Sequence, residues 1–166
     1  MNESNTRFYK QDSGDALYRR SMYTFWKRSA PPALMDIFNA PSRETCIVRR
    51  ERTNTPLQAL ATMNDPQFVE AARWLAQHAL KQANVEGQVN FMADRLLSRD
   101  LDAKEMAIVL ASYRDYLSYY DSKPDDAKRL LAVGESKADE SLPKPQFAAL
   151  TMVANELLNM DEVLVK

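Results

Sequence analysis

Two helix starts of the same kind lie close together in residues 55–66. Thr55 precedes Pro56 and Asp65 precedes Pro66, so that each proline follows a residue that can cap a helix. Proline suits the first position of a helix because the N–H group that it lacks is not used in the first turn. The chain is therefore expected to form two helices that meet at a sharp corner, one from Pro56 to about Met63 and one over residues 66–84.

Apolar residues recur at helical spacing through the rest of the chain. The expected stripes are Phe68, Val69, Ala72, Leu75, Ala76, Ala79 and Leu80; Val89, Met92, Ala93, Leu96 and Leu97; Met106, Val109, Leu110, Tyr113, Leu117 and Tyr120; and Phe147, Leu150, Ala154, Leu157 and Leu158. Asp102 and Glu105 have the spacing of a capping box, and Pro124 and Gly134 bound a further helix. Only three glycines are present, which argues against an all-β fold. The predicted fold is all-α, a bundle of four to six helices with an extended N-terminal segment.

Three regions are expected along the chain: a flexible segment over residues 1–17, an extended arginine-rich segment with a short helix over 18–54, and the bundle over 55–166, with 18–54 packed on it as one domain. The stretch 18–28 is ambiguous, because its apolar residues have helical spacing while its aromatic content favours a strand. We favour an extended conformation, with a short β pairing to residues 44–50 as an option. The short helix is expected at 33–38, after Pro32.

Composition excludes several classes of protein. The chain is 45% hydrophobic and 27% charged, as expected for a globular domain, and no apolar run is long enough to cross a membrane. Residues 1–15 lack the apolar core of a signal peptide. The single cysteine excludes an internal disulfide and a CxxCH haem attachment motif. Through residue 60 there are ten Lys/Arg and six Asp/Glu, a net charge of +4, which is too small an excess to predict nucleic-acid binding.

Seven arginines between residues 19 and 52 suggest two different roles. They could bind a carboxylate, sulfate or phosphate, or they could pair with Asp36, Glu44 and Glu51 to hold extended segments. The second role is favoured, because no glycine-rich loop or catalytic partner lies nearby. These arginines are Arg19, Arg20, Arg28, Arg43, Arg49, Arg50 and Arg52. If an anion site exists, Arg50, Arg52 and Asn54 are its predicted residues.

Other chemically active residues favour structural interpretations. Asn64, Asp65, Asn159, Asp161 and Glu162 offer oxygen ligands, but no calcium-loop spacing is present and no metal site is predicted. His78 lies beside Trp74 on the helical wheel, off the apolar stripe, so a surface position is expected. Cys46 lies between Thr45 and Ile47 and is expected to be buried as a small apolar residue.

Three stretches resemble one protein family: YRRSMYTFWKRSAPP, FNAPSRETCIVRRERTNTPLQALATMNDPQFVEAARWLA and AALTMVANELLNMDE. They are similar to the planctomycete-specific C-terminal domain of unknown function (domain of unknown function 1553), found downstream of planctomycete cytochrome c-type domains. The similarity runs from about Tyr18 to Glu162, and this chain resembles the C-terminal part of that domain. Asn39 departs from the pattern, in which aspartate is usual.

The resemblance implies a larger exported protein, periplasmic or otherwise outside the cytoplasm. No cofactor is expected in this chain, and haem c is expected only in the upstream region of full-length relatives. The upstream domains of the same polypeptide are the expected partner. If an apolar surface is uncovered, Met22, Tyr23, Phe25 and Trp26 are expected to mediate self-association.

Three functional hypotheses remain open. The first is a non-catalytic helical structural or interaction module. The second is part of a redox or carbohydrate-active enzyme whose arginine region binds an anionic sugar-like substrate. The third, a helical-repeat adaptor, is the weakest, because no repeat of about 34 residues is visible.

Overall fold

The computed structural model of the 166-residue chain describes residues 8–27, 29–49 and 51–165. The chain divides into two compact units, Met1–Gln58 and Ala59–Lys166. Helix α2 (Pro56–Asn64) begins in the first unit and ends in the second. The described part of the first unit is mostly irregular, whereas that of the second is mostly helical.

Short helical turns interrupt the irregular backbone of the first unit. They are the 3₁₀ helices η1 (Gly14–Tyr18) and η2 (Ser21–Tyr23) and the helix α1 (Ala33–Ile37), which follows Pro32. Asn39 ends α1 in the left-handed region, with φ of 53°, and Ala40 N–H donates to the carbonyl of Met35 at 2.8 Å. Asparagine tolerates this conformation better than other non-glycine residues, so it can end a helix there.

The β pairing considered for residues 18–28 and 44–50 is not found, because the described residues of both segments contain no strand. Met22, Tyr23 and Phe25 are instead 67, 64 and 66% exposed. A two-stranded ribbon needs an apolar face packed against something else to be stable. With these side chains exposed, residues 18–27 have no such face, and part of the segment forms 3₁₀ turns.

The second unit is a helical bundle built by the predicted caps. Its remaining helices are α3 (Pro66–Ala79), α4 (Val85–Leu97), α5 (Ala103–Ser122), α6 (Pro124–Leu131), α7 (Lys144–Leu158) and α8 (Asp161–Leu164). Asp65 accepts a hydrogen bond from Gln67 N–H at 2.9 Å, and Asp102 and Glu105 form the predicted capping box. The all-α fold class is therefore confirmed.

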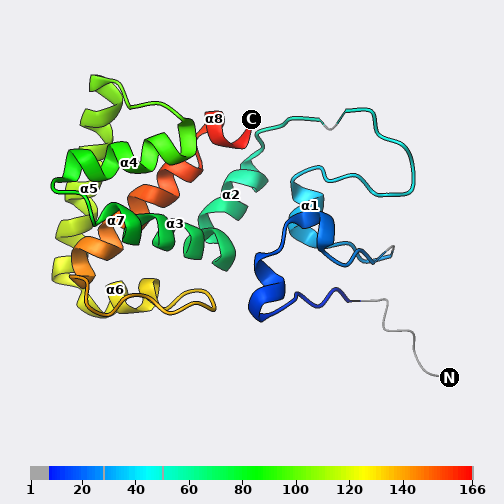
Figure 1. The fold of residues 1–166 in the computed structure, drawn as a ribbon, viewed down its shortest axis with the longest axis horizontal. Coiled ribbons are helices and arrows are strands. Elements are labelled where there is room, and N and C mark those ends of the chain that lie inside the picture. The colour runs from blue at the N-terminus through cyan, green and yellow to red at the C-terminus, as the bar shows by residue number, and fades with distance from the viewer. Residues whose placement is uncertain (1–7, 28, 50, 166) are drawn as a thin grey trace. The chain divides into compact units, whose positions relative to one another are not determined.

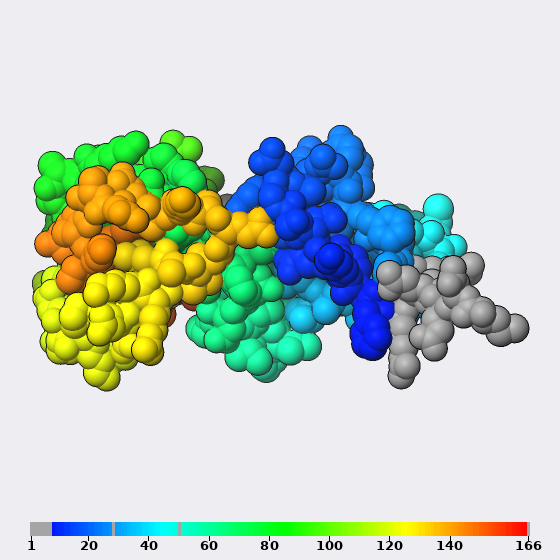
Figure 2. Space-filling view, turned by 90° about the horizontal axis from the view of Figure 1, so that it is seen from below, coloured from blue at the N-terminus to red at the C-terminus, as the bar shows by residue number. Residues whose placement is uncertain are grey.

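Helix α7 forms the centre of the second unit and packs against α3, α4, α5 and α6 (Figure 1). Phe147, Leu150 and Val153 on α7 have no exposed surface. The described part of α7 carries nine buried residues, so it is buried on most of its circumference and not only along one stripe. Figure 2 shows α6 and the loop after it, coloured yellow to orange, as a continuous outer surface of this unit.

Two helix ends differ from the sequence expectation, and one further helix is present. Helix α3 stops at Ala79 instead of continuing to residue 84, because Asn84 caps the next helix by accepting from Gly87 N–H at 2.7 Å. Helix α6 stops at Leu131, although Gly134 does have the expected left-handed backbone, with φ of 97°. The short helix α8 was not predicted. No helix in the described residues has the length and apolar character needed to cross a membrane.

Candidate functional site

The predicted anion-binding residues lie just before α2. Arg50 is outside the described residues, and Arg52 and Asn54 are exposed. Arg19, Arg20, Arg43 and Arg49 are also exposed, and Arg28 is outside the described residues. Because Arg28 and Arg50 lie outside the described residues, the predicted pairing of this segment with Asp36, Glu44 and Glu51 stays a prediction.

An open groove of about 640 Å³ lies in the first unit, lined by Thr24, Phe25, Trp26, Ser42, Arg43 and Glu44. The guanidinium carbon of Arg43 lies 5.4 Å from the centre of the Trp26 ring, within the range of a cation–π contact. Arg43 Nη2 also donates to the carbonyl of Ser21 at 3.4 Å. The backbone of Arg43 is left-handed, with φ of 64°.

The stretch before α2 forms a hydrogen-bonded junction around Gln58, which is 2% exposed. Thr55 and Gln58 form a capping box, since Thr55 N–H donates to Gln58 Oε1 at 2.9 Å and Gln58 N–H donates to Thr55 Oγ1 at 3.3 Å. Gln58 Nε2 donates to the carbonyl of Ile37 and to Thr53 Oγ1, both at 2.9 Å. Asn39 Nδ2 donates to the same Thr53 oxygen at 2.7 Å. The residues around the first proline start therefore connect α1 to α2.

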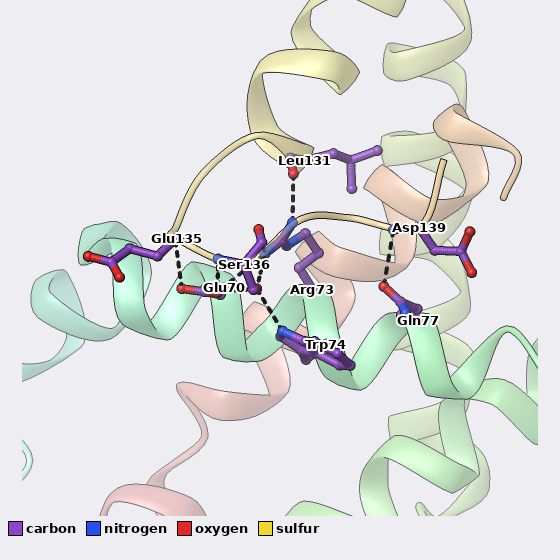
Figure 3. Close-up of polar contacts among 8 residues, drawn as sticks. All are labelled: Glu70, Arg73, Trp74, Gln77, Leu131, Glu135, Ser136 and Asp139. Carbon is purple, nitrogen blue, oxygen red and sulfur yellow. Dashed lines mark hydrogen bonds and ion pairs between the residues drawn. The ribbon is translucent and has the colours of Figure 1, made fainter. Parts of the chain in front are cut away.

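A second polar cluster, absent from the sequence expectation, contains two almost fully buried charged residues of α3 (Figure 3). Glu70 and Arg73 on α3 are 3 and 2% exposed, and Arg73 Nη2 lies 3.4 Å from Glu70 Oε1. Arg73 Nη1 donates to the carbonyl of Leu131 at 3.0 Å. Arg73 Nη2 donates to the carbonyl of Ser136 at 2.8 Å and to its Oγ at 2.7 Å.

Glu70, one turn earlier on α3, contacts the same loop. Its Oε1 accepts from Ser136 N–H at 2.8 Å and from the Ser136 hydroxyl, and its Oε2 accepts from Glu135 N–H at 3.2 Å. Trp74 Nε1 donates to Ser136 Oγ at 2.8 Å. We call Glu70, Arg73 and Ser136 the buried clamp. It fixes the start of the loop between α6 and α7 onto α3.

Gly134 is required in this arrangement. A β-carbon at this position would lie 2.5 Å from Glu70 Oε2, closer than real contacts allow. The left-handed φ of 97° also favours glycine. The same residue therefore permits the turn and makes room for the carboxylate.

The contacts of the buried clamp are those of a structural link between a helix and a loop, not those of a catalytic site. A serine nucleophile needs a base that takes its proton and an oxygen that a substrate can reach. Ser136 Oγ already accepts from Arg73 and Trp74 and donates to Glu70. Since these contacts are internal and both charged groups are almost fully buried, the cluster favours a structural role.

A third polar cluster joins α8 to the start of α5. Arg99 makes two hydrogen bonds of 2.8 Å to Glu105 and contacts Glu162 at 2.8 and 3.1 Å. The hydrogen bonds from Arg99, together with that from the Asp102 backbone, lower the pKa of the Glu105 carboxyl to about 2. Three turns further along α5, burial and a 2.6 Å hydrogen bond to Glu156 raise the pKa of Tyr116.

The remaining candidates are distributed as follows. His78 is exposed and stacks on Trp74 with ring centres 5.8 Å apart, so its expected surface position is confirmed. Cys46 is exposed, so its predicted burial was wrong, because residues 41–49 form an exposed loop instead of a paired strand. Among the oxygen ligands considered for calcium, Asp65 caps α3 and Glu162 pairs with Arg99. The described residues contain no group of three acidic, histidine or cysteine side chains placed to hold a metal.

The helices of the second unit form a bundle in which buried polar contacts join segments that are distant in the sequence. The sequence of the chain matches the family model described as "Protein of unknown function (DUF1553)" over residues 1–113. The chain belongs to that family. No curated protein and no solved structure matches it.

Proposed function

We propose that this chain is a non-catalytic helical module that packs against other regions of a larger exported protein. The observation that carries the proposal is the buried clamp. Its carboxylate and guanidinium are engaged with the chain's own loop and lie out of reach of a substrate. Active-site groups instead face a cleft, with environments that tune their pKa values for reaction. The location outside the cytoplasm and the neighbouring cytochrome c-type region are inferred from the family resemblance.

The proposed contact surface of the module is the exposed apolar part of the first unit. Met22, Tyr23 and Phe25 are each more than 60% exposed, and Trp26 is half-buried beside them in sequence. Several large apolar side chains in one short segment favour association with another surface. We propose that the upstream domains of the same polypeptide cover this segment. In the isolated chain, a second copy is expected to take their place.

The oligomeric state of the isolated chain tests this proposal. Light scattering across a dilution series is expected to show concentration-dependent association of the wild-type chain. A Met22→Ser/Phe25→Ser variant is expected to remain monomeric. Ile108→Ser is the matched control, because Ile108 is a similarly exposed apolar residue, at 68%, that lies on α5 and outside the proposed contact surface. A wild-type chain that stays monomeric at every concentration would refute the proposed surface.

A second candidate function is suggested by the arginines. Part of an enzyme that binds an anionic sugar-like substrate would need exposed guanidinium groups, and Arg43 and Arg52 are exposed. The net charge of +4 through residue 60 would attract such a ligand. A ligand that binds the folded chain raises its melting temperature by mass action. Under this hypothesis sulfate or sugar acids raise the melting temperature, and Arg50→Ala abolishes the effect.

A further inference from the structure

The groove beside Trp26 includes a residue with an uncommon backbone conformation. Arg43 adopts a left-handed backbone, with φ of 64°, in an exposed turn. This conformation costs a non-glycine residue on the order of 1 kcal/mol, and such residues are concentrated at ligand-binding positions. Here the left-handed residue is the one whose guanidinium lies over the Trp26 ring. The backbone and the aromatic ring together fix the position of a positive charge at the edge of the groove.

Arg43 retains hydrogen-bonding capacity toward a ligand. One of its N–H groups donates to the carbonyl of Ser21, and the described residues provide no carboxylate within ion-pair distance. A planar guanidinium presents several further N–H groups in a geometry that matches a carboxylate or sulfate. The contact with Trp26 orders the side chain before binding, which reduces the entropy lost when a ligand is bound.

The other groove residues restrict the class of ligand. Phe25 is 66% exposed and provides an apolar surface, while Thr24, Ser42 and Glu44 provide two hydroxyl groups and a carboxylate. A small inorganic anion would not use Phe25. A sugar ring has an apolar C–H face for Phe25 and hydroxyl groups that can form hydrogen bonds with Thr24 and Ser42. An acidic substituent on the ring would complement Arg43.

We propose that this groove binds a sugar ring that carries a carboxylate or sulfate group, with Arg43 holding the acidic group and Phe25 packing on the ring. The proposal rests on the second candidate function and gives it a location different from Arg50, Arg52 and Asn54. It does not require catalysis.

The proposal is tested by titrating the ¹⁵N-labelled chain with methyl glucuronide and following the indole N–H signals. The chain has two tryptophans, and a Trp26→Phe variant assigns the signals. The Trp26 signal is expected to shift saturably, with a Kd on the order of 1 mM for so open a groove. The Trp74 signal, from the second unit, is the internal control and is expected to stay fixed. A parallel titration with a sulfated monosaccharide measures whether a sulfate group on a sugar ring is bound as tightly as a carboxylate group.

Two variants and two competing ligands test each part of the proposal. Arg43→Asn removes the guanidinium but keeps a residue that tolerates left-handed φ, and it is expected to weaken binding at least about tenfold. Phe25→Ser is expected to do the same, whereas Arg52→Ala is expected to leave the affinity unchanged. Methyl glucoside, which lacks the charge, and acetate at equal ionic strength, which lacks the ring, are expected to give no saturable shift.

Absence of a shift with both acidic sugars would overturn the proposal. Acetate that binds as well as the glucuronide would replace it with a simple anion site, and an unchanged affinity in Arg43→Asn would exclude Arg43. These results do not test the buried clamp, which is tested by the stability of the second unit. Because Phe25 and Trp26 also belong to the proposed contact surface, the titration is made at a concentration at which light scattering shows a monomer. A shift abolished by Arg52→Ala but not by Arg43→Asn would keep the second candidate function and reject this location.

Discussion

Replacing Arg73 by alanine tests whether the buried clamp holds the second unit together. The substitution removes three hydrogen bonds, to Leu131 O, Ser136 O and Ser136 Oγ, at 3.0, 2.8 and 2.7 Å. It also leaves the Glu70 carboxylate, which is 3% exposed, without its counter-charge. Removing one partner of a buried ion pair typically costs about 3–5 kcal/mol. For a chain of this size, that corresponds to a fall in melting temperature of about 6–20 °C.

Urea unfolding followed by circular dichroism measures this loss directly, because a change in midpoint at constant slope reports stability. Arg114→Ala is the matched control, since Arg114 is exposed on α5, and it is expected to change the free energy of unfolding by less than about 0.5 kcal/mol. Adding Glu70→Gln to Arg73→Ala removes the unpaired charge and is expected to recover more than about 1 kcal/mol. An Arg73→Ala variant within about 1 kcal/mol of wild type would refute the reasoning.

Three further predictions concern the second unit. Gly134→Ala is expected to cost about 1–3 kcal/mol in urea unfolding, because of the left-handed φ and the clash with Glu70. Since Arg99 depresses the pKa of Glu105 to about 2, this pair stabilises the fold above pH of about 4.5 and loses its effect as pH falls towards 2. Glu105→Gln should reduce that acid sensitivity in pH-dependent melts. A chain ending at residue 113 lacks α7 and should show no cooperative unfolding transition.

Local rules account for the parts of the fold that the sequence predicts well. Asp65 and Asp102 act as helix caps because a cap depends only on residues two or three positions away. The apolar stripe of α3 is also local, and Val69, Ala72 and Ala76 are buried as expected. These features need no knowledge of which segment packs on the helix.

The missed features depend on distant segments. Glu70, Arg73, Trp74 and Gln77 form a second stripe on α3, at helical spacing, which faces the loop that follows α6. The helical spacing of these residues is visible in the sequence. Their contacts are with the backbone of residues 131–139, and no sequence pattern predicts that this segment lies against α3. A charged stripe is usually exposed to solvent, so its burial could not be predicted from residue type.

In helix α2, too, burial could not be predicted from residue type. Leu57, Leu60 and Met63 are about half exposed, at 55, 58 and 47%, whereas Gln58 and Thr62 are buried. Gln58 is buried by its junction in the first unit, and Thr62 by Asn155 and Asn159 in the second, the latter at 2.8 Å from its hydroxyl. Residue polarity alone would predict that the apolar side chains of α2 are buried and that Gln58 and Thr62 are exposed. The reverse is found because Gln58 and Thr62 are buried together with their hydrogen-bond partners.

The buried clamp also bears on how far the family domain extends. The family match covers residues 1–113 and so includes Glu70 and Arg73, but the groups that satisfy them belong to residues 131–136. A buried carboxylate and guanidinium are stable only when their hydrogen bonds are complete. A domain limited to the matched residues would leave both groups without these partners and would expose the face of α3 that packs on α7. The physical unit that contains α3 of this chain therefore includes residues 131–158.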